Sequence, residues 1–157
     1  MKITLKGIKT FTGMEGEGFS ATLYVDGKKA GDVFDDARGG EMTYRVPDSV
    51  FERLLAHAAK VKDDDDESDS KLSPETMAKL KLDCLMAGLV DDIMEERQIK
   101  RWCSKSTVFL LKGDEEGRYR TIKAKYEPKV AKHVREKYGD KLVEIVNERF
   151  LKASAAK

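Results

Sequence analysis

Basic and aromatic residues alternate in one stretch of the C-terminal half. From Gly117 the chain reads Gly-Arg-Tyr-Arg-Thr-Ile-Lys-Ala-Lys-Tyr. Arginine and lysine form charge-assisted hydrogen bonds with phosphates, and aromatic rings stack on bases, so this pattern suits a phosphate-bearing ligand. The first candidate set is Arg101, Trp102, Lys105, Arg118, Tyr119, Arg120, Lys123 and Lys125. Aromatic residues at the edge of a core, flanked by solvated charges, explain the same pattern equally well.

Strand alternation within this stretch divides the charges between two sides. A period of two places Arg118, Arg120 and Tyr126 on one side of a strand, and Lys123 and Lys125 on the other. One flat basic patch therefore requires a bulge near the middle of the strand.

A second candidate is the glycine pair of Arg38-Gly39-Gly40, together with Lys28, Lys29 and Arg45. Glycine lets backbone N–H groups approach an anion closely, and nearby arginines could clamp a phosphate. The neighbouring carboxylates of Asp35, Asp36 and Glu41 oppose an anion there, and a plain glycine-rich loop is the simpler explanation.

Signatures of catalysis are missing from the sequence. It contains neither a Gly-x-Ser-x-Gly elbow nor a phosphate-binding Gly-x-x-x-x-Gly-Lys loop. Carboxylates for a divalent metal come from two groups, and a solvated helix face explains the second group better. The groups are Asp32, Asp35 and Asp36, and Asp91, Asp92, Glu95 and Glu96. We expect no catalytic residue, no metal and no cofactor.

Cys84 and Cys103 are expected to be reduced structural thiols. Both fall in one long helical region, and on a single straight helix they would lie too far apart to form a disulfide. No second cysteine or histidine stands close enough to either to suggest a zinc site, because His57 and His133 are isolated.

The net charge of +1 is an average over three unlike segments. Residues 1–62 hold ten basic and nine acidic side chains, residues 63–96 hold three and twelve, and residues 97–157 hold seventeen and eight. The segments therefore carry +1, −9 and +9. A basic C-terminal third favours a polyanionic partner, whereas ion pairs within the chain explain the pattern more simply.

The first third predicts an antiparallel β-meander of three strands. Residues 19–25 alternate between apolar and polar, and residues 3–8 alternate more loosely. Asp26-Gly27 is a strong hairpin signal, and a short apolar return is expected at residues 44–46.

Helical spacing of apolar residues follows. One helix is expected to begin with Asp48 as its N-cap, and a second runs from a Ser73 cap to between Arg97 and Lys100. The acidic residues 63–70 between them are expected to form a mobile loop, because their like charges repel.

The C-terminal third predicts a second hairpin over residues 107–125 and then two helices. The first helix begins at Pro128 and ends before Gly139. The second begins after an Asp140 cap and continues through Phe150.

These elements predict an α+β fold in a single domain of residues 1–152, followed by a tail at residues 153–157. No run approaches the roughly 18 apolar residues of a membrane-spanning helix. The charged N-terminus does not look like a secretory signal, so a cytoplasmic protein is expected.

Several stretches resemble a group of small proteins encoded by tailed phages and prophages. They are residues 19–31, Arg38-Gly39-Gly40, residues 107–126, and Tyr138-Gly139-Asp140-Lys141. The likeness covers most of the chain apart from the acidic loop. Relatives often have Asn-Asp-Gly before the glycine pair, where this chain has Asp35-Asp36-Ala37. The group offers no functional residues to carry over.

The resemblance implies an accessory phage protein in the cytoplasm of the host cell. We expect a non-enzymatic protein that binds and blocks a host protein or sequesters a phosphate-bearing ligand, including in counter-defence. Nucleic-acid binding through residues 97–126 is the alternative, and a divalent-metal nuclease is the third hypothesis. No membrane partner is expected, and a homo-oligomer is left open.

Overall fold

The computed structural model describes residues 1–61 and 72–155, so the predicted acidic loop lies outside the described residues. Contacts within the chain divide it into two compact units, residues 1–92 and 93–157, which are described one after the other. Such a division does not test whether the chain unfolds as one unit, and the single domain stays a prediction. The α+β class is confirmed.

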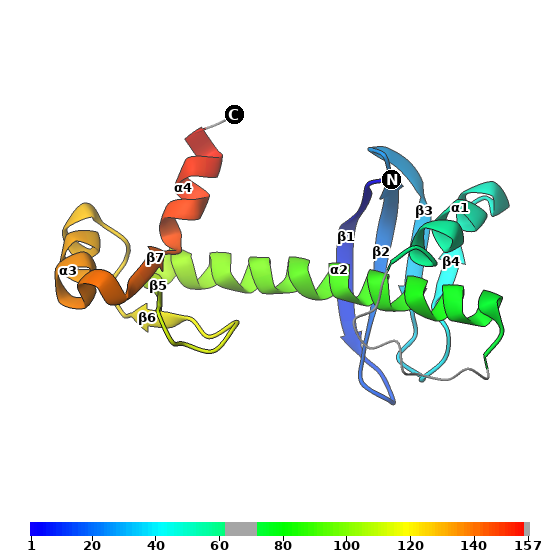
Figure 1. The fold of residues 1–157 in the computed structure, drawn as a ribbon, viewed down its shortest axis with the longest axis horizontal. Coiled ribbons are helices and arrows are strands. Elements are labelled where there is room, and N and C mark those ends of the chain that lie inside the picture. Colours follow the sequence, from blue (N-terminus) through cyan, green and yellow to red (C-terminus); the bar gives the residue numbers. More distant parts are fainter. Residues whose placement is uncertain (62–71, 156–157) are drawn as a thin grey trace. The chain divides into compact units, whose positions relative to one another are not determined.

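The first unit is built on a four-stranded antiparallel sheet. Its strands are β1 (Ile3–Thr12), β2 (Glu17–Val25), β3 (Lys28–Asp35) and β4 (Thr43–Arg45), paired in chain order (Figure 1). The meander is confirmed, and the short apolar return adds the fourth strand.

A β-bulge near the middle of β1 explains the loose alternation of its sequence. Lys6 pairs with Thr22 and Lys9 with Ser20, so Gly7 and Ile8 together face the single residue between those partners. Gly7 has a φ of +64°, a left-handed conformation that glycine adopts without a steric penalty. Two side chains spaced three apart therefore lie on the same face of the sheet.

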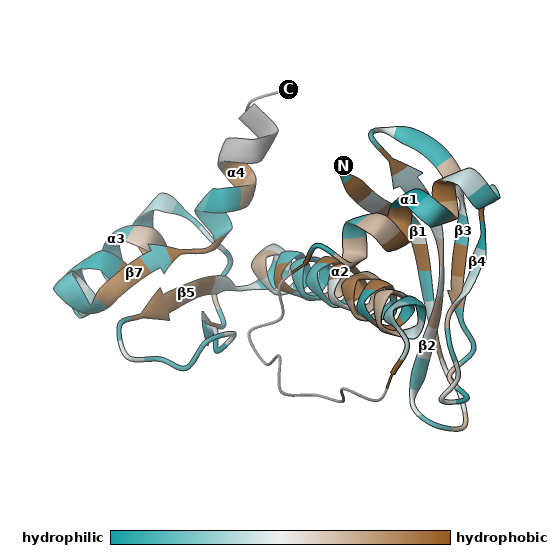
Figure 2. Ribbon diagram, turned by 45° about the vertical axis from the view of Figure 1, so that its right-hand side comes forward, coloured by the Kyte–Doolittle hydropathy of each residue, from teal (hydrophilic) through white to brown (hydrophobic). Residues whose placement is uncertain are grey.

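The inner face of this sheet is the one covered by helices. Leu23 and Val33 on this face are fully buried, as are Leu54 of α1 (Asp48–Ala58) and Leu82 of α2 (Pro74–Lys105). Figure 2 shows α1 and the first turns of α2 on the same side of the sheet. Each such side chain contributes about 1.5–3 kcal/mol on burial, so this core holds the unit together.

The helix starts follow the sequence only in part. The Ser73 cap is confirmed, because the Thr76 N–H donates to Ser73 Oγ at 3.2 Å. The Asp48 cap is wrong: Asp48 is the first helical residue, Pro47 precedes it, and no side chain caps the helix. The second helix continues to Lys105, because Ile99 and Cys103 extend its apolar stripe into the core of the second unit.

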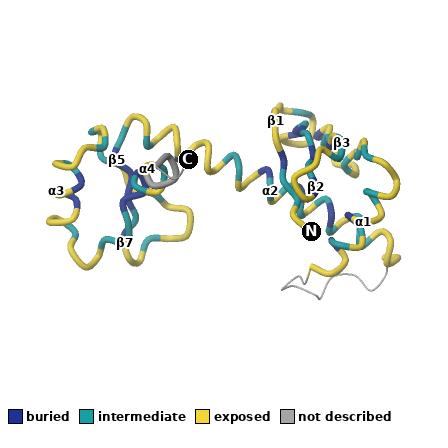
Figure 3. Tube along the Cα trace, turned by 90° about the horizontal axis from the view of Figure 1, so that it is seen from above, coloured by how far each residue is buried: buried dark blue, intermediate teal, exposed yellow. Residues whose placement is uncertain are grey.

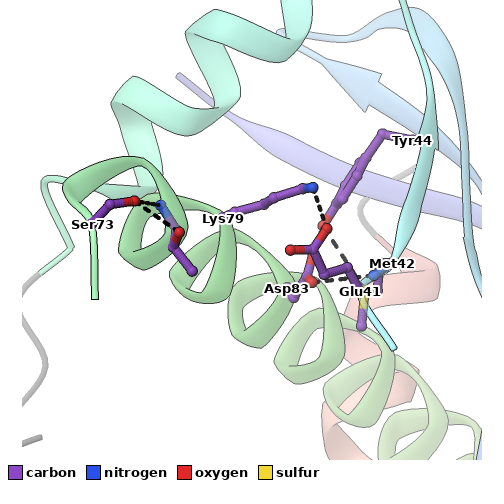
Figure 4. A network of polar contacts seen from close by, with 7 residues as sticks. Glu41, Met42, Tyr44, Ser73, Lys79 and Asp83 are labelled. Carbon is purple, nitrogen blue, oxygen red and sulfur yellow. Dashed lines mark hydrogen bonds and ion pairs between the residues drawn. The ribbon is translucent and has the colours of Figure 1, made fainter. Parts of the chain in front are cut away.

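Hydrogen bonds to one carboxylate tie β4 to α2. Tyr44 donates its O–H to Asp83 Oδ1 at 2.6 Å, and the Met42 N–H donates to Asp83 Oδ2 at 3.2 Å (Figure 4). An ion pair between Lys79 and Glu41 lies beside them. Burial, with the Asp83 carboxylate second, raises the pKa of the Tyr44 phenol far above its usual range. The network holds β4 in a fixed register against the helix.

The second unit contains a three-stranded sheet in the order β6-β5-β7. β5 (Thr107–Leu111) lies between β6 (Arg120–Ile122) and β7 (Leu142–Ile145), and both neighbours are antiparallel to it. Four of the five β5 residues are buried, and the strand is hydrophobic along most of its length (Figures 2 and 3). The predicted hairpin is confirmed, although β6 is shorter than expected.

The last part of the chain differs from the sequence prediction. α3 (Pro128–Tyr138) is as expected and a 3-10 turn, η1 (Gly139–Lys141), follows it. Residues 142–145, predicted to be helical, form β7, and the helix begins only at α4 (Asn147–Ala155). Residues 142–145 form a strand because they pair with β5, and the spacing of their apolar residues alone does not distinguish a strand from a helix. Part of the predicted tail is therefore helical.

A buried amide joins three elements of the second unit. Asn147 is almost fully buried, and its Oδ1 accepts the Val108 N–H at 2.8 Å. Its Nδ2 donates to the carbonyls of Cys103 at 3.0 Å and Ser106 at 2.9 Å. The start of α4, the end of α2 and β5 are thus held by one side chain whose polar atoms are all bonded.

Replacing Tyr44 with Phe should change how stability depends on pH. Because the pKa of Tyr44 is raised in the folded protein, the unfolded chain releases this proton first once the pH exceeds about 10. The phenol therefore stabilises the fold fully below about pH 10, and less as the pH rises further. In urea denaturation we expect Tyr44→Phe to lower the free energy of unfolding by about 1–2 kcal/mol at pH 8. That deficit should shrink by about 1 kcal/mol at pH 11. A deficit equal at both pH values would contradict a raised pKa of Tyr44 in the folded protein.

Candidate functional site

The two arginines of the predicted basic hairpin are paired within the hairpin itself. Arg120 donates from Nε and Nη2 to the Asp114 carboxylate, at 2.8 Å and 2.6 Å. These bonds hold the pKa of Asp114 below its usual range. The guanidinium of Arg118 lies 4.0 Å from Glu115. Both charges are thus partly neutralised before any ligand arrives.

The structure brings together only some of the other residues in the first candidate set. The rings of Trp102 and Tyr119 lie 6.2 Å apart, and Tyr119 donates its O–H to Glu95. β6 ends at Ile122, so the predicted alternation over residues 118–126 is wrong beyond that residue. Lys123 and Lys125 lie in the irregular segment that follows.

Arg101 and Lys105 lie on the last turns of α2, where both are exposed and neither forms an ion pair with another described side chain. The hairpin and this helix end therefore contribute a few separate cations and one aromatic pair. They do not form the continuous basic patch that the sequence suggested.

The glycine loop after β3 already faces a negative charge. A Cβ placed on Gly39 would clash with Oε2 of Glu15, so this carboxylate fills the space beside the loop backbone. An anion bound there would be repelled, which argues against the phosphate loop predicted around Arg38. Arg45 belongs elsewhere, on β4.

The outer face of the first sheet collects basic and aromatic side chains. Directly paired residues of antiparallel strands point to the same side, so the register assigns each one. One row runs Lys6, Thr22, Asp32 and Arg45, and the next runs Lys9, Ser20, Phe34 and Thr43. Tyr24 and Lys29 are paired at one end, and Phe11 and Gly18 at the other. In Figure 2 both helices of this unit lie on the opposite side.

An aromatic pair lies across three strands of this face. The rings of Phe11 and Phe34 are stacked, with centroids 5.7 Å apart and planes inclined by 26°. The Phe11 ring covers Gly18, since a Cβ there would lie 2.7 Å from the ring. Phe11 is nevertheless 39% exposed, so a flat apolar surface remains open to a ligand.

Two basic residues, Lys9 and Arg45, border a shallow hollow that Phe34 also lines. The hollow has a volume of about 510 Å³, and the side chains that border it include Lys9, Thr22, Asp32, Phe34 and Arg45. Asp32 accepts a hydrogen bond from Thr22 Oγ1 at 3.0 Å. Lys9 and Arg45 form no ion pair with another described residue. With Lys6 and Lys29, the face thus carries four basic side chains against one carboxylate.

The described residues contain no group of three or more histidine, cysteine or acidic side chains that could hold a metal ion. Neither carboxylate group that the sequence suggested for a metal forms such a site. Among the described helices, none is long and apolar enough to span a membrane.

A scan against protein-family models and searches of curated proteins and of solved structures found no match to this chain. The case for the outer face therefore rests on its own geometry.

Sequence reasoning named Lys29, Asp32 and Arg45 in other roles, but it missed the aromatic pair and the lysines of β1 on this face. Two signals were available. The motif Lys6-Gly7-Ile8-Lys9 places a glycine between two lysines, which is compatible with a bulge. The outward positions of the meander also include three aromatic residues, Phe11, Tyr24 and Phe34, where polar residues are usual.

Adding a methyl group at Gly18 should disturb the aromatic pair. The new Cβ would lie 2.5 Å from the Asp35 carbonyl oxygen and 2.7 Å from the Phe11 ring, so strand or ring must move. We expect Gly18→Ala to lower the free energy of unfolding by about 1–3 kcal/mol in urea denaturation. Gly40→Ala is the matched control, because nothing lies within 4 Å of a Cβ at that position. Equal stability of the two variants would show that Phe11 does not cover Gly18.

Proposed function

We propose that this protein is a non-enzymatic binding protein that holds a short stretch of single-stranded nucleic acid on the outer face of its first sheet. The stacked pair of Phe11 and Phe34, open to solvent beside Lys9 and Arg45, carries the proposal. Bases of any identity stack on aromatic rings, and cations at the side of the stack pair with the phosphates.

The size of the face supports a site for a few nucleotides. Gly18 and Tyr24 mark its two ends on β2, six residues apart, which corresponds to about 20 Å. Each end has an aromatic ring. The Phe11 ring lies over Gly18 at one end, and the Tyr24 ring lies at the other, with the Lys6 ammonium 4.4 Å from its centre. Stacking at two places with cations between them matches a single strand whose bases are unpaired.

A double helix fits this surface less well. Its bases are stacked on each other and present only their edges, so exposed rings on a sheet face gain little from it. Side-chain amides, which read base edges, are missing from the assigned outer face. We therefore expect a preference for single strands with little dependence on sequence.

This proposal moves the nucleic-acid site away from residues 97–126, because Arg118 and Arg120 are paired with Glu115 and Asp114. A metal nuclease is not proposed, since the described carboxylates form no metal-holding group. An accessory role in phage infection, through a blocked host factor or counter-defence, rests on the resemblance alone.

Salt dependence separates phosphate contacts from other binding. Three phosphate contacts on a single strand give a slope of about −2 in a plot of log K against log salt. Affinity for a fluorescently labelled oligothymidine should therefore fall by about tenfold or more between 50 and 200 mM salt, measured by anisotropy. A duplex of the same length should bind more weakly. Absent binding, or binding unaffected by salt, would refute the proposal.

Substitutions on the outer face should weaken this binding without unfolding the protein. Phe34→Ala removes one stacking ring, and we expect a loss of about five- to hundredfold in affinity. Arg45→Gln should reduce the salt slope by about one. Arg118→Gln is the matched control, with the same charge change on the hairpin of the second unit. If Arg118→Gln weakens binding and Arg45→Gln does not, the site lies on the hairpin; circular dichroism checks the fold of each variant.

A further inference from the structure

The second unit has its own open cleft, at the end of α2 and the start of α4. Its volume is about 290 Å³, and its lining includes Lys100 and Cys103 of α2, Lys125 and Tyr126 of the segment after β6, and Phe150 and Leu151 of α4. The cleft is independent of the outer face of the first sheet and of the function proposed for it.

Most of the lining is apolar. Phe150 and Cys103 both pack against the core cluster of Ile99, Val108 and Val146, and both also line the cleft. Leu151 is 54% exposed and extends the apolar lining to the border of the cleft. An apolar ligand would remove this surface from water, which is favourable by about 25 cal/mol per Å².

The uncharged polar groups at the cleft are already used by the protein. Asn147 makes three hydrogen bonds to the backbone, and Ser104 donates its hydroxyl to the Arg101 carbonyl at 2.7 Å. Tyr126 donates its hydroxyl to Glu148 at 3.0 Å. None of these groups is left to recognise a base or a sugar, so the cleft does not suit a nucleotide.

Two lysines, Lys100 and Lys125, are among the residues that line the cleft. Lys125 forms no ion pair with another described side chain. Lys100 is paired with Glu96 at 2.6 Å, but both side chains are more than half exposed, and such pairs contribute little. The Lys100 ammonium also lies 5.3 Å from the centre of the Phe150 ring, directly beside the apolar lining.

We propose that this cleft binds an amphiphilic carboxylate: an aliphatic body lies against Phe150 and Leu151, and the carboxylate pairs with Lys125 and Lys100. A medium-chain fatty acid such as decanoate has this chemistry. A ligand with about twelve non-hydrogen atoms is expected to bind with a dissociation constant near the millimolar range.

The two cysteines provide the test, because only one of them lines the cleft. Cys103 lies in it, whereas Cys84 is exposed on α2 in the first unit and acts as the internal control. Burial raises the pKa of the Cys103 thiol, so alkylation by iodoacetamide is carried out at about pH 9. The full-length protein is alkylated, then digested, and the modified peptides are measured by mass spectrometry. Decanoate at about ten times its dissociation constant should slow alkylation of Cys103 roughly tenfold and leave Cys84 unchanged.

Matched ligands and variants separate this proposal from the alternatives. Acetate lacks the aliphatic chain and decanol lacks the carboxylate, so both should protect Cys103 much less than decanoate does. Lys125→Glu should abolish the protection, and Lys123→Glu, the same change two residues away on an exposed side chain, should keep it. The proposal is overturned if decanoate fails to protect Cys103, if it protects Cys84 as well, or if decanol or adenosine monophosphate protects equally. It is also overturned if Cys103 becomes protected on raising the protein concentration alone, which would mean that a second copy fills the cleft.

Discussion

One extra residue in β1 determines which side chains each face of the first sheet presents. Because the bulge at Gly7 and Ile8 shifts the register, Leu5 and Ile8 both enter the core and Lys6 and Lys9 both remain outside. A regular strand would turn Lys9 inward, toward the helices, and burying an unpaired ammonium costs several kcal/mol. The core and the basic surface therefore depend on the same backbone irregularity.

The two units differ in how their basic side chains are paired, and this difference bears on the basic C-terminal third of the sequence. In the second unit many basic side chains have acidic partners nearby, as in Arg120 with Asp114, Arg135 with Glu148 and Arg149 with Glu144. The first unit holds 13 basic and 19 acidic side chains by sequence, a net charge of −6, yet Lys9 and Arg45 lie together on one face of its sheet without described ion-pair partners. Segment sums of charge therefore could not indicate that basic side chains of the first unit gather on one face of its sheet.

Local patterns in the sequence were sufficient for most elements and insufficient for the site. The meander, the Asp26-Gly27 turn, the Ser73 cap and the second hairpin follow from spacing and from single residues. β7 does not, because Leu-Val-Glu-Ile fits a helix stripe as well as a short strand until β5 is beside it. Choosing the basic hairpin by residue type ignored Asp114, whose bonds to Arg120 form only across a loop. The outer face needed the register of four strands, and a glycine bulge changes that register.

β1 is also an edge strand, since only β2 pairs with it in the described sheet. A ten-residue edge strand, whose outer backbone donors and acceptors face no neighbouring strand of the described sheet, invites pairing with another chain, a common route to aggregation. The bulge interrupts the regular spacing of those groups, and Lys6 and Lys9 place like charges where a second copy would have to approach. The features that make this surface attractive to a polyanion are therefore the same ones that discourage the sheet from extending into a neighbouring molecule.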